Sequence, residues 1–347
     1  MNKLLIKKII AVNNLNSINQ QNNNSDKLLI KKNIPINNIN SINQHNNNTD
    51  KLLIKKNITI NNINSINQHN NNSIIADNKY ILDEYHKIDY PQNKFNKTLI
   101  LYVFHQLNDR VANFINKCIF KDNKFDFIFI INDKNFHISI LQLPDYVKYI
   151  LRDNIGFDFG GWSEGLLKNN LYKNYDSFIF INSSVYGPCM ENRDIYTKWP
   201  DILLNGLNYN DIKLFGTTIN CMNKPKTNSH VQSMVFCMDI NTLEYLISKN
   251  IFSIEIFEKN MEQCIYNREI RMSREIINNN WNIGCLHTYY NNIDFRFKIY
   301  QKPTNYFLGD LCNKNIFFGK TIHPFEILFV KGNRNIECNF IKKYIKC

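Results

Sequence analysis

The segment "KTLILYVFHQLNDRVANFINKCIFKDNKFDFIFIIN", residues 97–132, holds two short apolar runs separated by an amphipathic stretch. The runs at residues 97–104 and 125–132 are rich in β-branched and aromatic residues, which predicts two buried strands. Between them, apolar side chains recur at helical spacing, at Val111, Phe114, Ile115 and Cys118. A strand, a helix and a second strand in this order predict a parallel sheet with right-handed crossovers.

Short apolar runs and amphipathic stretches continue to alternate toward the C-terminus. Further strands are predicted at residues 177–182, 212–218 and 233–238, and further helices at residues 160–170, 240–249 and 268–280. No linker interrupts this pattern. We therefore predict that residues 76–347 form one α/β domain of Rossmann-like type, with a mostly parallel mixed sheet.

The first 75 residues have a different composition. "KLLIKK" recurs at Lys3, Lys27 and Lys51, and each copy is followed by an Asn-rich tract. A fixed period can indicate a solenoid, but asparagine is a poor helix former and is depleted in strands. We predict that residues 1–75 are a disordered low-complexity extension, with oligomerisation or tethering as the alternative.

The net charge of +12 is concentrated in these repeats. Residues 1–73 hold nine lysines and two aspartates, so more than half of the excess lies outside the predicted domain. The charge therefore does not indicate a nucleic-acid groove on the folded part, and we expect no nucleic-acid partner. A nucleic-acid role for the repeats is a weaker alternative, because they lack the aromatic residues on which single-strand binders stack bases.

The nine cysteines and the N-terminus both favour an intracellular protein. The cysteine count is odd and includes no C-x-x-C pair, which is typical of free thiols in a reducing compartment. The N-terminus lacks a clear apolar core and cleavage site of a signal peptide. No run approaches the roughly 20 apolar residues that cross a bilayer. We predict a cytoplasmic protein without a transmembrane segment.

A glycine-rich loop is the first candidate site. "RDNIGFDFGGWSEGL", residues 152–166, contains four of the 11 glycines of the chain. Ligands of open α/β sheets bind beyond the carboxyl ends of the strands, where such glycines would let the backbone approach a ligand closely. Asp158 would accept hydrogen bonds from sugar or ribose hydroxyls, or bind a metal. The alternative is a plain turn in which Asp158 caps a helix.

A second candidate site follows the strand predicted at residues 177–182. Asn182, Ser183 and Ser184 come at its carboxyl end. Small polar residues at this position suit hydroxyl or phosphate contacts, and they equally suit an ordinary turn.

Two more segments carry polar side chains at regular spacing. His230 and Gln232 would point to the same side of a strand, although a lone histidine is more often structural than catalytic. Glu269 and Ser273 are four residues apart and would share one helix face, for which a solvated charge pattern is the alternative.

The order of these segments resembles the rhamnan synthesis F family, glycosyltransferase-like proteins that are taken to have a GT-A type nucleotide-sugar fold. The resemblance covers residues 97–335 and leaves the repeats outside. The matching segments are "NIGFDFGGW" (154–162), "FIFINSSVYGP" (178–188), "HVQSMVFCMD" (230–239), "REIRMSREIINNNWNIGCL" (268–286) and "HPFEILFVKGNR" (323–334).

The resemblance implies a transferase that moves a sugar from a nucleotide-sugar donor to a glycan or another hydroxyl acceptor, as in polysaccharide synthesis. Glu269 would be the catalytic base that removes the acceptor's proton. His230, Gln232 and Ser273 would line the acceptor side of the pocket or the pocket itself. The donor would be bound by Arg152, Asn154, Gly156, Asp158, Asn182, Ser183 and Ser184, with Arg152 offsetting diphosphate charge.

The implied metal site departs from the family pattern. GT-A enzymes in general hold Mn²⁺ or Mg²⁺ at an acidic D-x-D loop, and by position that loop is Asn182–Ser183–Ser184 here. It contains no carboxylate, which such cations prefer. A divalent metal is therefore in doubt at this loop, and Asp158 is the candidate ligand.

The missing carboxylates favour one alternative function. The chain would then be a catalytically inactive glycosyltransferase-like domain that binds a glycan or a partner. The presence of both Asp158 and Glu269 speaks against it. An unrelated α/β enzyme is the remaining alternative.

Overall fold

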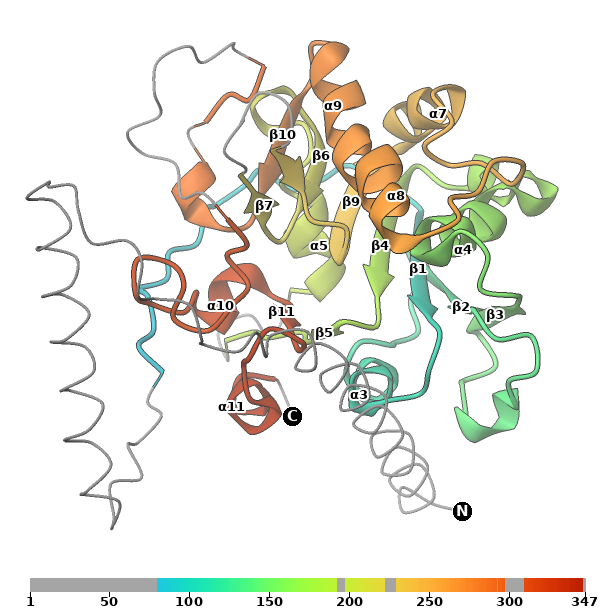
Figure 1. Cartoon of the computed structure of the whole chain (residues 1–347), viewed down its shortest axis with the longest axis horizontal. Coiled ribbons are helices and arrows are strands. Elements are labelled where there is room, and N and C mark those ends of the chain that lie inside the picture. The colour runs from blue at the N-terminus through green and yellow to red at the C-terminus, as the bar shows by residue number, and fades with distance from the viewer. Residues whose placement is uncertain (1–79, 192–196, 222–228, 292, 297–308, 346–347) are drawn as a thin grey trace, which may run out of the picture. The chain divides into compact units, whose positions relative to one another are not determined.

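A seven-stranded sheet organises the protein, whose computed structural model describes residues 80–191, 197–221, 229–291, 293–296 and 309–345. In chain order its strands are β1 (Thr98–Phe104), β2 (Phe125–Ile131), β3 (Lys148–Leu151), β4 (Ser177–Asn182), β6 (Ile212–Gly216), β9 (Val235–Asp239) and β10 (Asn282–Cys285). In space they follow the order β10-β6-β9-β4-β1-β2-β3 (Figure 1). Strand β9 runs antiparallel to β4 and β6, whereas the other neighbours pair in parallel. The predicted α/β class and mostly parallel mixed sheet are confirmed.

Helices cover both faces of the sheet. They are α3 (Asp109–Lys117), α4 (Phe157–Leu167), α5 (Trp199–Leu204), α7 (Ile240–Ser248), α8 (Met261–Cys264), α9 (Arg271–Asn278), α10 (Pro324–Ile327) and α11 (Cys338–Lys342). A π-helical turn, Ile265–Ile270, joins α8 to α9. Apolar side chains of α4, α7 and α9 pack on one face of the sheet, and those of α3 and α5 pack on the other.

Short elements lie outside the main sheet. Strands β5 (Val185–Tyr186) and β11 (Val330–Lys331) form one two-stranded ribbon, and β7 (Ile219–Asn220) and β8 (His230–Val231) form another. Short 3₁₀ turns occur at Ile138–Ile140, Lys168–Asn174, Tyr209–Asp211 and Thr288–Tyr290.

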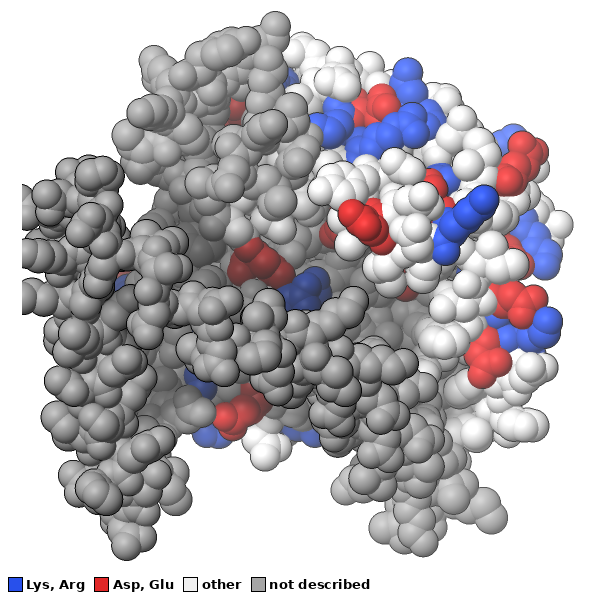
Figure 2. Space-filling view, in the orientation of Figure 1, with Lys and Arg blue, Asp and Glu red and all other residues white. Residues whose placement is uncertain are grey.

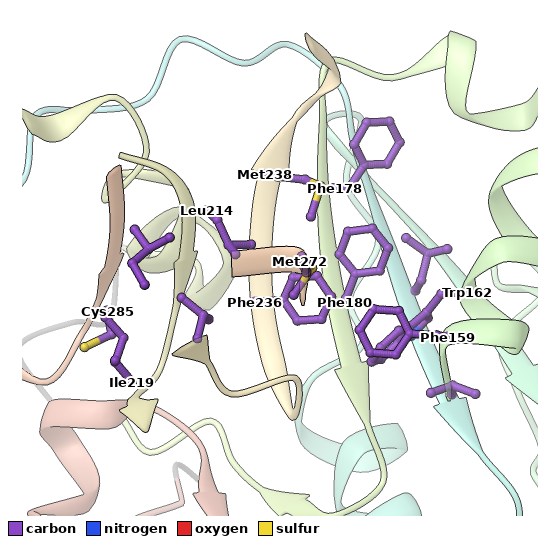
Figure 3. Packing of buried hydrophobic residues seen from close by; sticks show 14 of the residues in the cluster. Phe159, Trp162, Phe178, Phe180, Leu214, Ile219, Phe236, Met238, Met272 and Cys285 are labelled. Carbon is purple, nitrogen blue, oxygen red and sulfur yellow. The ribbon is translucent and has the colours of Figure 1, made fainter. Parts of the chain in front are cut away.

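Aromatic side chains fill the core beneath α4 (Figure 3). Phe180 of β4 stacks on Phe236 of β9 with ring centroids 4.6 Å apart. The ring of Trp162 from α4 meets both in edge-to-face geometry, at 5.6 and 5.4 Å. Such pairs contribute about 0.5–1.5 kcal/mol beyond the burial of their area. This cluster fixes α4, and with it the first turn of that helix, against the centre of the sheet.

The glycines of α4 serve packing rather than ligand approach. A Cβ on Gly161 would lie 2.9 Å from Val103 Cγ2, and one on Gly165 would lie 2.9 Å from Ile130 Cδ1. A Cβ on Gly160 would lie only 2.1 Å from the Ile155 carbonyl oxygen. The expectation that these three glycines bring the backbone close to a ligand is therefore wrong. They let the helix approach β1, β2 and its own preceding loop.

The structure bears on some of the other sequence-based predictions and not on others. The eight cysteines among the described residues are free thiols, as predicted. Within the same described residues, no helix has both the length and the apolar character needed to cross a membrane. The repeats predicted at residues 1–75 lie outside the described residues, so the division into residues 1–75 and 76–347 remains a prediction.

Candidate functional site

The candidate site lies at the carboxyl ends of β1 and β4, where the β5–β11 ribbon crosses the end of the sheet (Figure 1). In that ribbon Lys331 is the partner of Val185, and the Gly332 N–H donates to the carbonyl oxygen of Ser184 at 2.8 Å. The segment that follows β4 is thus held by residues almost 150 positions later in the chain. Two of the sequence segments that carry the family resemblance meet here.

Asp158 stands in the first turn of α4 and faces the end of β4. Gly156 caps the helix in the left-handed region, with φ of +71°, and a Cβ there would lie 2.7 Å from Phe257 Cδ1. Asn182 Nδ2 donates to Asp158 Oδ2 at 3.0 Å. The structure therefore joins the glycine-rich loop to the Asn-Ser-Ser loop through one hydrogen bond between two predicted site residues.

The Asn182 side chain also orders the loop that follows it. Its Oδ1 accepts hydrogen bonds from the Ser184 N–H at 3.0 Å and from Ser184 Oγ at 2.6 Å. The backbone N–H of Ser183 donates to the Val103 carbonyl at 3.0 Å, which attaches the loop to the end of β1. Both serines are half-buried and belong to one hydrogen-bonded turn.

Glu269 reaches the site from the π-helical turn. Its Oε1 accepts the Ser233 N–H at 2.7 Å, and four residues on, Ser273 Oγ accepts the Val231 N–H at 3.0 Å. The predicted common face of these two residues thus contacts one short backbone segment, residues 231–233, which runs from β8 toward β9. Single π turns inside helices occur frequently at functional sites.

Asp158 and Glu269 are close enough to interact electrostatically. The pKa of Asp158 is raised from 3.8 to about 6: burial is the largest cause and the charge of Glu269 adds to it, while the Asn182 hydrogen bond and the charge of Lys331 act in the opposite direction. Desolvation disfavours an ionised carboxylate, so it dominates over the single hydrogen bond. Two carboxylates and one ammonium group therefore form one electrostatic unit.

Asp310 and Gln232 extend this polar cluster. Burial opposes the ionisation of Asp310, but hydrogen bonds from Arg334 and Cys312 and the charge of Lys331 keep the pKa of Asp310 below its usual value. Gln232 Nε2 donates to Asp310 Oδ1 at 3.2 Å. Figure 2 shows acidic and basic side chains next to one another near the middle of the view.

A family model described as rhamnan synthesis protein F, RgpF, matches residues 127–305, just over half of the chain. The chain belongs to the rhamnan synthesis protein F family. No curated protein matches it.

Solved structures show only distant similarity. A mannosyltransferase from Pyrobaculum calidifontis, in complex with GDP-Man and Mn²⁺, is 8% identical over 47% of this chain and 50% of its own, with a TM-score of 0.32. The glycosyltransferase GlyE of Streptococcus pneumoniae is 12% identical over 56% of this chain and 46% of its own, also at 0.32. A cytidylyltransferase from Leptospira borgpetersenii is 11% identical over 55% of this chain and 74% of its own, at 0.31. The chain thus spans about half the length of the first two proteins, and scores this low support no conclusion about function.

Arg152 of this RgpF-family chain is buried, and its side chain makes its contacts within the protein. Its Nε donates to Glu164 Oε2 at 2.8 Å, its Nη1 to Asn132 Oδ1 at 2.6 Å and its Nη2 to the Ile155 carbonyl at 2.6 Å. These contacts tie the loop before α4 to the helix and to the end of β2. Asn154 is exposed in that same loop. Contact of either side chain with a donor stays a prediction.

His230 and Ser273 lie in and against the short strand β8. His230 is buried in β8 opposite Asn220, and Ser273 is buried with its hydroxyl directed at the β8 backbone. Both therefore support the segment that carries Gln232 and Ser233.

The site also contains residues to which no role was assigned from the sequence of this RgpF-family chain. Lys331 falls in the segment 323–334, which carries part of the resemblance, but only the pairing of β11 with β5 places it here. Asp310 lies outside the helices and strands, and no sequence pattern around it indicates a functional residue. Arg110 is part of an amphipathic helix, and its contact with Ser183 is a tertiary one, with Nε donating to the carbonyl oxygen at 2.6 Å.

The loop after β4 does not fit the divalent metal that the resemblance implies. Asn182 supplies a neutral amide whose oxygen already accepts two hydrogen bonds from Ser184. The positive charge of Lys331 acts on the nearest carboxylate, Asp158. Within the described part of the chain, no group of three or more His, Cys, Asp and Glu side chains could hold a metal ion. Hard cations bind best to several anionic oxygens, which this loop does not provide.

Proposed function

We propose that this protein transfers a sugar, a hexosyl or deoxyhexosyl group, from a nucleotide-sugar to a hydroxyl group of a glycan or another acceptor. The observation that carries the proposal is the cluster of Asp158, Asn182, Glu269 and Lys331 at the carboxyl ends of the central strands. Ligands of α/β sheets bind at this edge, and the chain belongs to a family of glycan synthesis proteins.

Glu269 is the proposed catalytic base. The Ser233 N–H holds its Oε1, so the carboxylate is oriented and its Oε2 is left to take the proton from an acceptor hydroxyl. The acceptor oxygen bonds to the anomeric carbon while the bond from that carbon to the diphosphate breaks, and the nucleoside diphosphate leaves. General base catalysis of this kind contributes about 10²–10⁴-fold to the rate.

Asp158 is the proposed donor contact. With its pKa near 6 the carboxylate is mostly ionised at neutral pH and accepts hydrogen bonds from a sugar or ribose hydroxyl. Asn182 holds one of its oxygens, which leaves the other for the ligand. The half-buried hydroxyl groups of Ser183 and Ser184 and the backbone of the buried Gly156 are the proposed further contacts of the donor.

A transfer assay on the full chain tests this proposal. The chain is incubated with UDP-, GDP- and dTDP-sugars and a set of glycan acceptors, and nucleoside diphosphate and glycosylated product are measured together. We expect transfer from one donor class, and a loss of about 10²–10⁴-fold in kcat for Glu269→Gln with donor binding retained. Asp153→Asn is the matched control, because Asp153 is exposed in the loop before α4 and pairs with Lys134. Absence of transfer from every donor would contradict the proposal.

One observation favours a second candidate, a binding module without turnover. The Asn182–Ser183–Ser184 turn lacks the carboxylate that catalytic members of the resembled fold carry at this position. If donors or glycans bind with equal affinity to the wild type and to Glu269→Gln, and neither yields product, this second function is the better account.

A further inference from the structure

A second cavity lies apart from the candidate site, where α10, α5 and the segment before β1 come together (Figure 1). Its volume is about 160 Å³, and none of the residues that line it belongs to the candidate site. A cavity of about 150 Å³ can hold a six-membered carbon ring. This one is therefore large enough for one ring of a small molecule. The lining includes Tyr90, Ile202, Asn205, Phe325, Glu326 and Leu328.

Glu326 gives this cavity a buried carboxylate with one oxygen available to a ligand. Its Oε1 accepts hydrogen bonds from the Thr288 N–H at 2.7 Å and from Thr288 Oγ1 at 2.8 Å, and it lies 2.8 Å from His287 Nδ1. Its Oε2 makes no hydrogen bond with any described residue, although Glu326 is only 5% exposed. Buried polar atoms are nearly always hydrogen-bonded. The free oxygen of this buried side chain therefore indicates a ligand that donates a hydrogen bond.

Asn205 offers a donor to the same cavity. Its Oδ1 accepts the Asn93 N–H at 2.9 Å and Asn93 Nδ2 at 2.8 Å, which fixes the orientation of the amide. The NH₂ group of Asn205 donates to none of the residues that the structure describes. Phe325 and Leu328 add apolar surface beside these polar groups. An acceptor, a donor and an apolar wall together suit a ring that carries both hydroxyl groups and C–H faces.

The charges around the cavity disfavour an anion and a metal ion. Glu326 and Asp89 both line it, and they would repel a phosphate. Lys87 also lines the cavity, where it would repel a cationic ligand, and its ammonium group is paired with Glu191 at 3.8 Å. No group of three or more His, Cys, Asp and Glu side chains that could hold a metal ion occurs among the described residues. A neutral ligand with several hydroxyl groups fits these charges best.

We propose that this cavity binds one saccharide residue of the acceptor glycan, apart from the place of transfer. Glu326 Oε2 accepts a hydrogen bond from one sugar hydroxyl, and Asn205 Nδ2 donates one to another. This inference rests on the proposed function.

The chain connects the cavity closely to the candidate site. The N–H of Cys189 donates to the carbonyl oxygen of Leu328 at 2.7 Å, and both residues line the cavity. Leu328 stands three residues before Lys331, and three residues of chain span at most about 11 Å. A glycan bound in the cavity is thus held near the proposed place of transfer.

Ligand-observed NMR of the full chain tests the inference without any nucleotide. Methyl glycosides of hexoses and of 6-deoxyhexoses are titrated one by one, and saturation transfer from the protein is measured. We expect one of these glycosides to bind. Glu326→Gln, which replaces the free acceptor by an amide of the same shape, should weaken its binding about 10- to 100-fold, the usual range for a hydrogen bond to a charged group.

Two further variants separate binding from misfolding. Asn205→Asp keeps the oxygen that accepts from Asn93 but removes the donor, and it should also weaken glycoside binding about 10-fold. It leaves the contacts of Glu326 in place, so it decides the question if Glu326→Gln does not fold. Glu337→Gln is the matched control, because Glu337 is exposed in the same C-terminal segment and its side chain caps no helix. Its affinity should equal that of the wild type.

The transfer assay supplies a second readout. Glu326→Gln and Asn205→Asp should raise KM for the glycan acceptor and leave kcat unchanged, because they remove binding that is equal in the ground state and the transition state. Glu269→Gln should instead lower kcat.

The outcomes distinguish this inference from the function on which it rests. If no glycoside binds to the wild type, or if one binds equally to the wild type and to both variants, the inference is wrong, and transfer from a nucleotide-sugar would still support the proposed function. If a glycoside binds to the wild type and more weakly to both variants, while no donor gives transfer, the saccharide cavity stands and the transferase proposal is wrong.

Discussion

Asp158 is the residue on which most of the site depends. Its carboxylate links the first turn of α4 to the end of β4 through Asn182, and it responds to the charges of both Glu269 and Lys331. A single substitution here should therefore change both the stability of the protein and its activity, in ways that depend on pH.

The pKa of Asp158 predicts opposite trends for stability and activity. In the unfolded chain the pKa is near 3.8, and in the folded chain burial raises it to about 6. Protonation of Asp158 therefore stabilises the folded state. This contribution is complete below about pH 4 and is lost as the pH rises through about 6. Activity should rise over the same window as the carboxylate ionises.

Urea denaturation and rate measurements between pH 4 and 8 check this. We expect the unfolding free energy of the wild type to fall, relative to Asp158→Asn, as the pH rises from 4 to 6. Asp153→Asn should show no such difference, because Asp153 is exposed. A constant difference between wild type and Asp158→Asn across this range would show that Asp158 titrates normally.

Gly156 supports a second prediction at the residue scale. Its φ of +71° strains any residue with a Cβ by about 1–2 kcal/mol, and that Cβ would also meet Phe257 Cδ1 at 2.7 Å. Gly319 has a similar φ of +81° but open space around it. Gly156→Ala should therefore lower the unfolding free energy by more than Gly319→Ala does. Equal losses would mean that the loop before α4 adapts freely.

At the scale of elements, α4 is placed by contacts that its glycines allow. A Cβ on Gly165 would lie 2.9 Å from Ile130 Cδ1 and 3.3 Å from Leu101 Cδ2, on the two strands beneath the helix. Alanine has a better helix propensity than glycine by about 1 kcal/mol, whereas overpacking costs about 1–3 kcal/mol. The gain in helix propensity and the cost of overpacking oppose each other in Gly165→Ala. We expect overpacking to be the larger effect, because the strands beneath the helix are held in the sheet.

A double-mutant cycle tests this packing. Gly165→Ala should destabilise the protein, and Ile130→Val, which removes the clashing Cδ1, should cost about 0.5–1.5 kcal/mol on its own. The double variant should lose less than the sum of the two changes, because the valine makes room for the new methyl group. Simple additivity, measured by urea denaturation, would contradict a close contact between Gly165 and Ile130.

The sequence predicts the central elements better than the peripheral ones. Strands β1, β2 and β4 are buried apolar runs, and they occur where the pattern predicts them. Strand β3 was not predicted, because "KYIL" is short and half of it is exposed at the edge of the sheet. Strand β10, "NIGC", was not predicted either, because it contains a glycine and an asparagine and comes shortly after a helix. Two-residue strands such as β5 and β11 exist only through their pairing, which no local pattern shows.

Some residues of the candidate site could likewise be predicted from the sequence, and others could not. The meeting of Asp158 and Asn182 follows from the rule that loops at the carboxyl ends of parallel strands share one edge. Lys331 could not be found by that rule, because a ribbon that closes across almost 150 residues brings it in. The π turn that directs Glu269 likewise breaks the regular helix predicted at residues 268–280.

On the scale of the whole molecule, the two ends of the described chain hold each other beside the site. Tyr80 stacks on Phe340 with ring centroids 3.7 Å apart, and Tyr85 stacks on His323 at 4.4 Å. The C-terminal segment that carries Lys331 is thus fastened both to the β5 strand and to the residues that precede β1 (Figure 1). The site is an assembly of segments from the full length of the described domain.

Hydrogen–deuterium exchange of the full chain, with and without UDP-, GDP- and dTDP-sugars, tests the location of this site most directly. We expect one donor to slow exchange in residues 154–162, 182–186, 229–234 and 328–334 together. Residues 138–147, beside the outer edge strand β3, should exchange at an unchanged rate. Protection confined to other segments, or no protection by any donor, would contradict the assignment of the donor site to Asp158 and its neighbours.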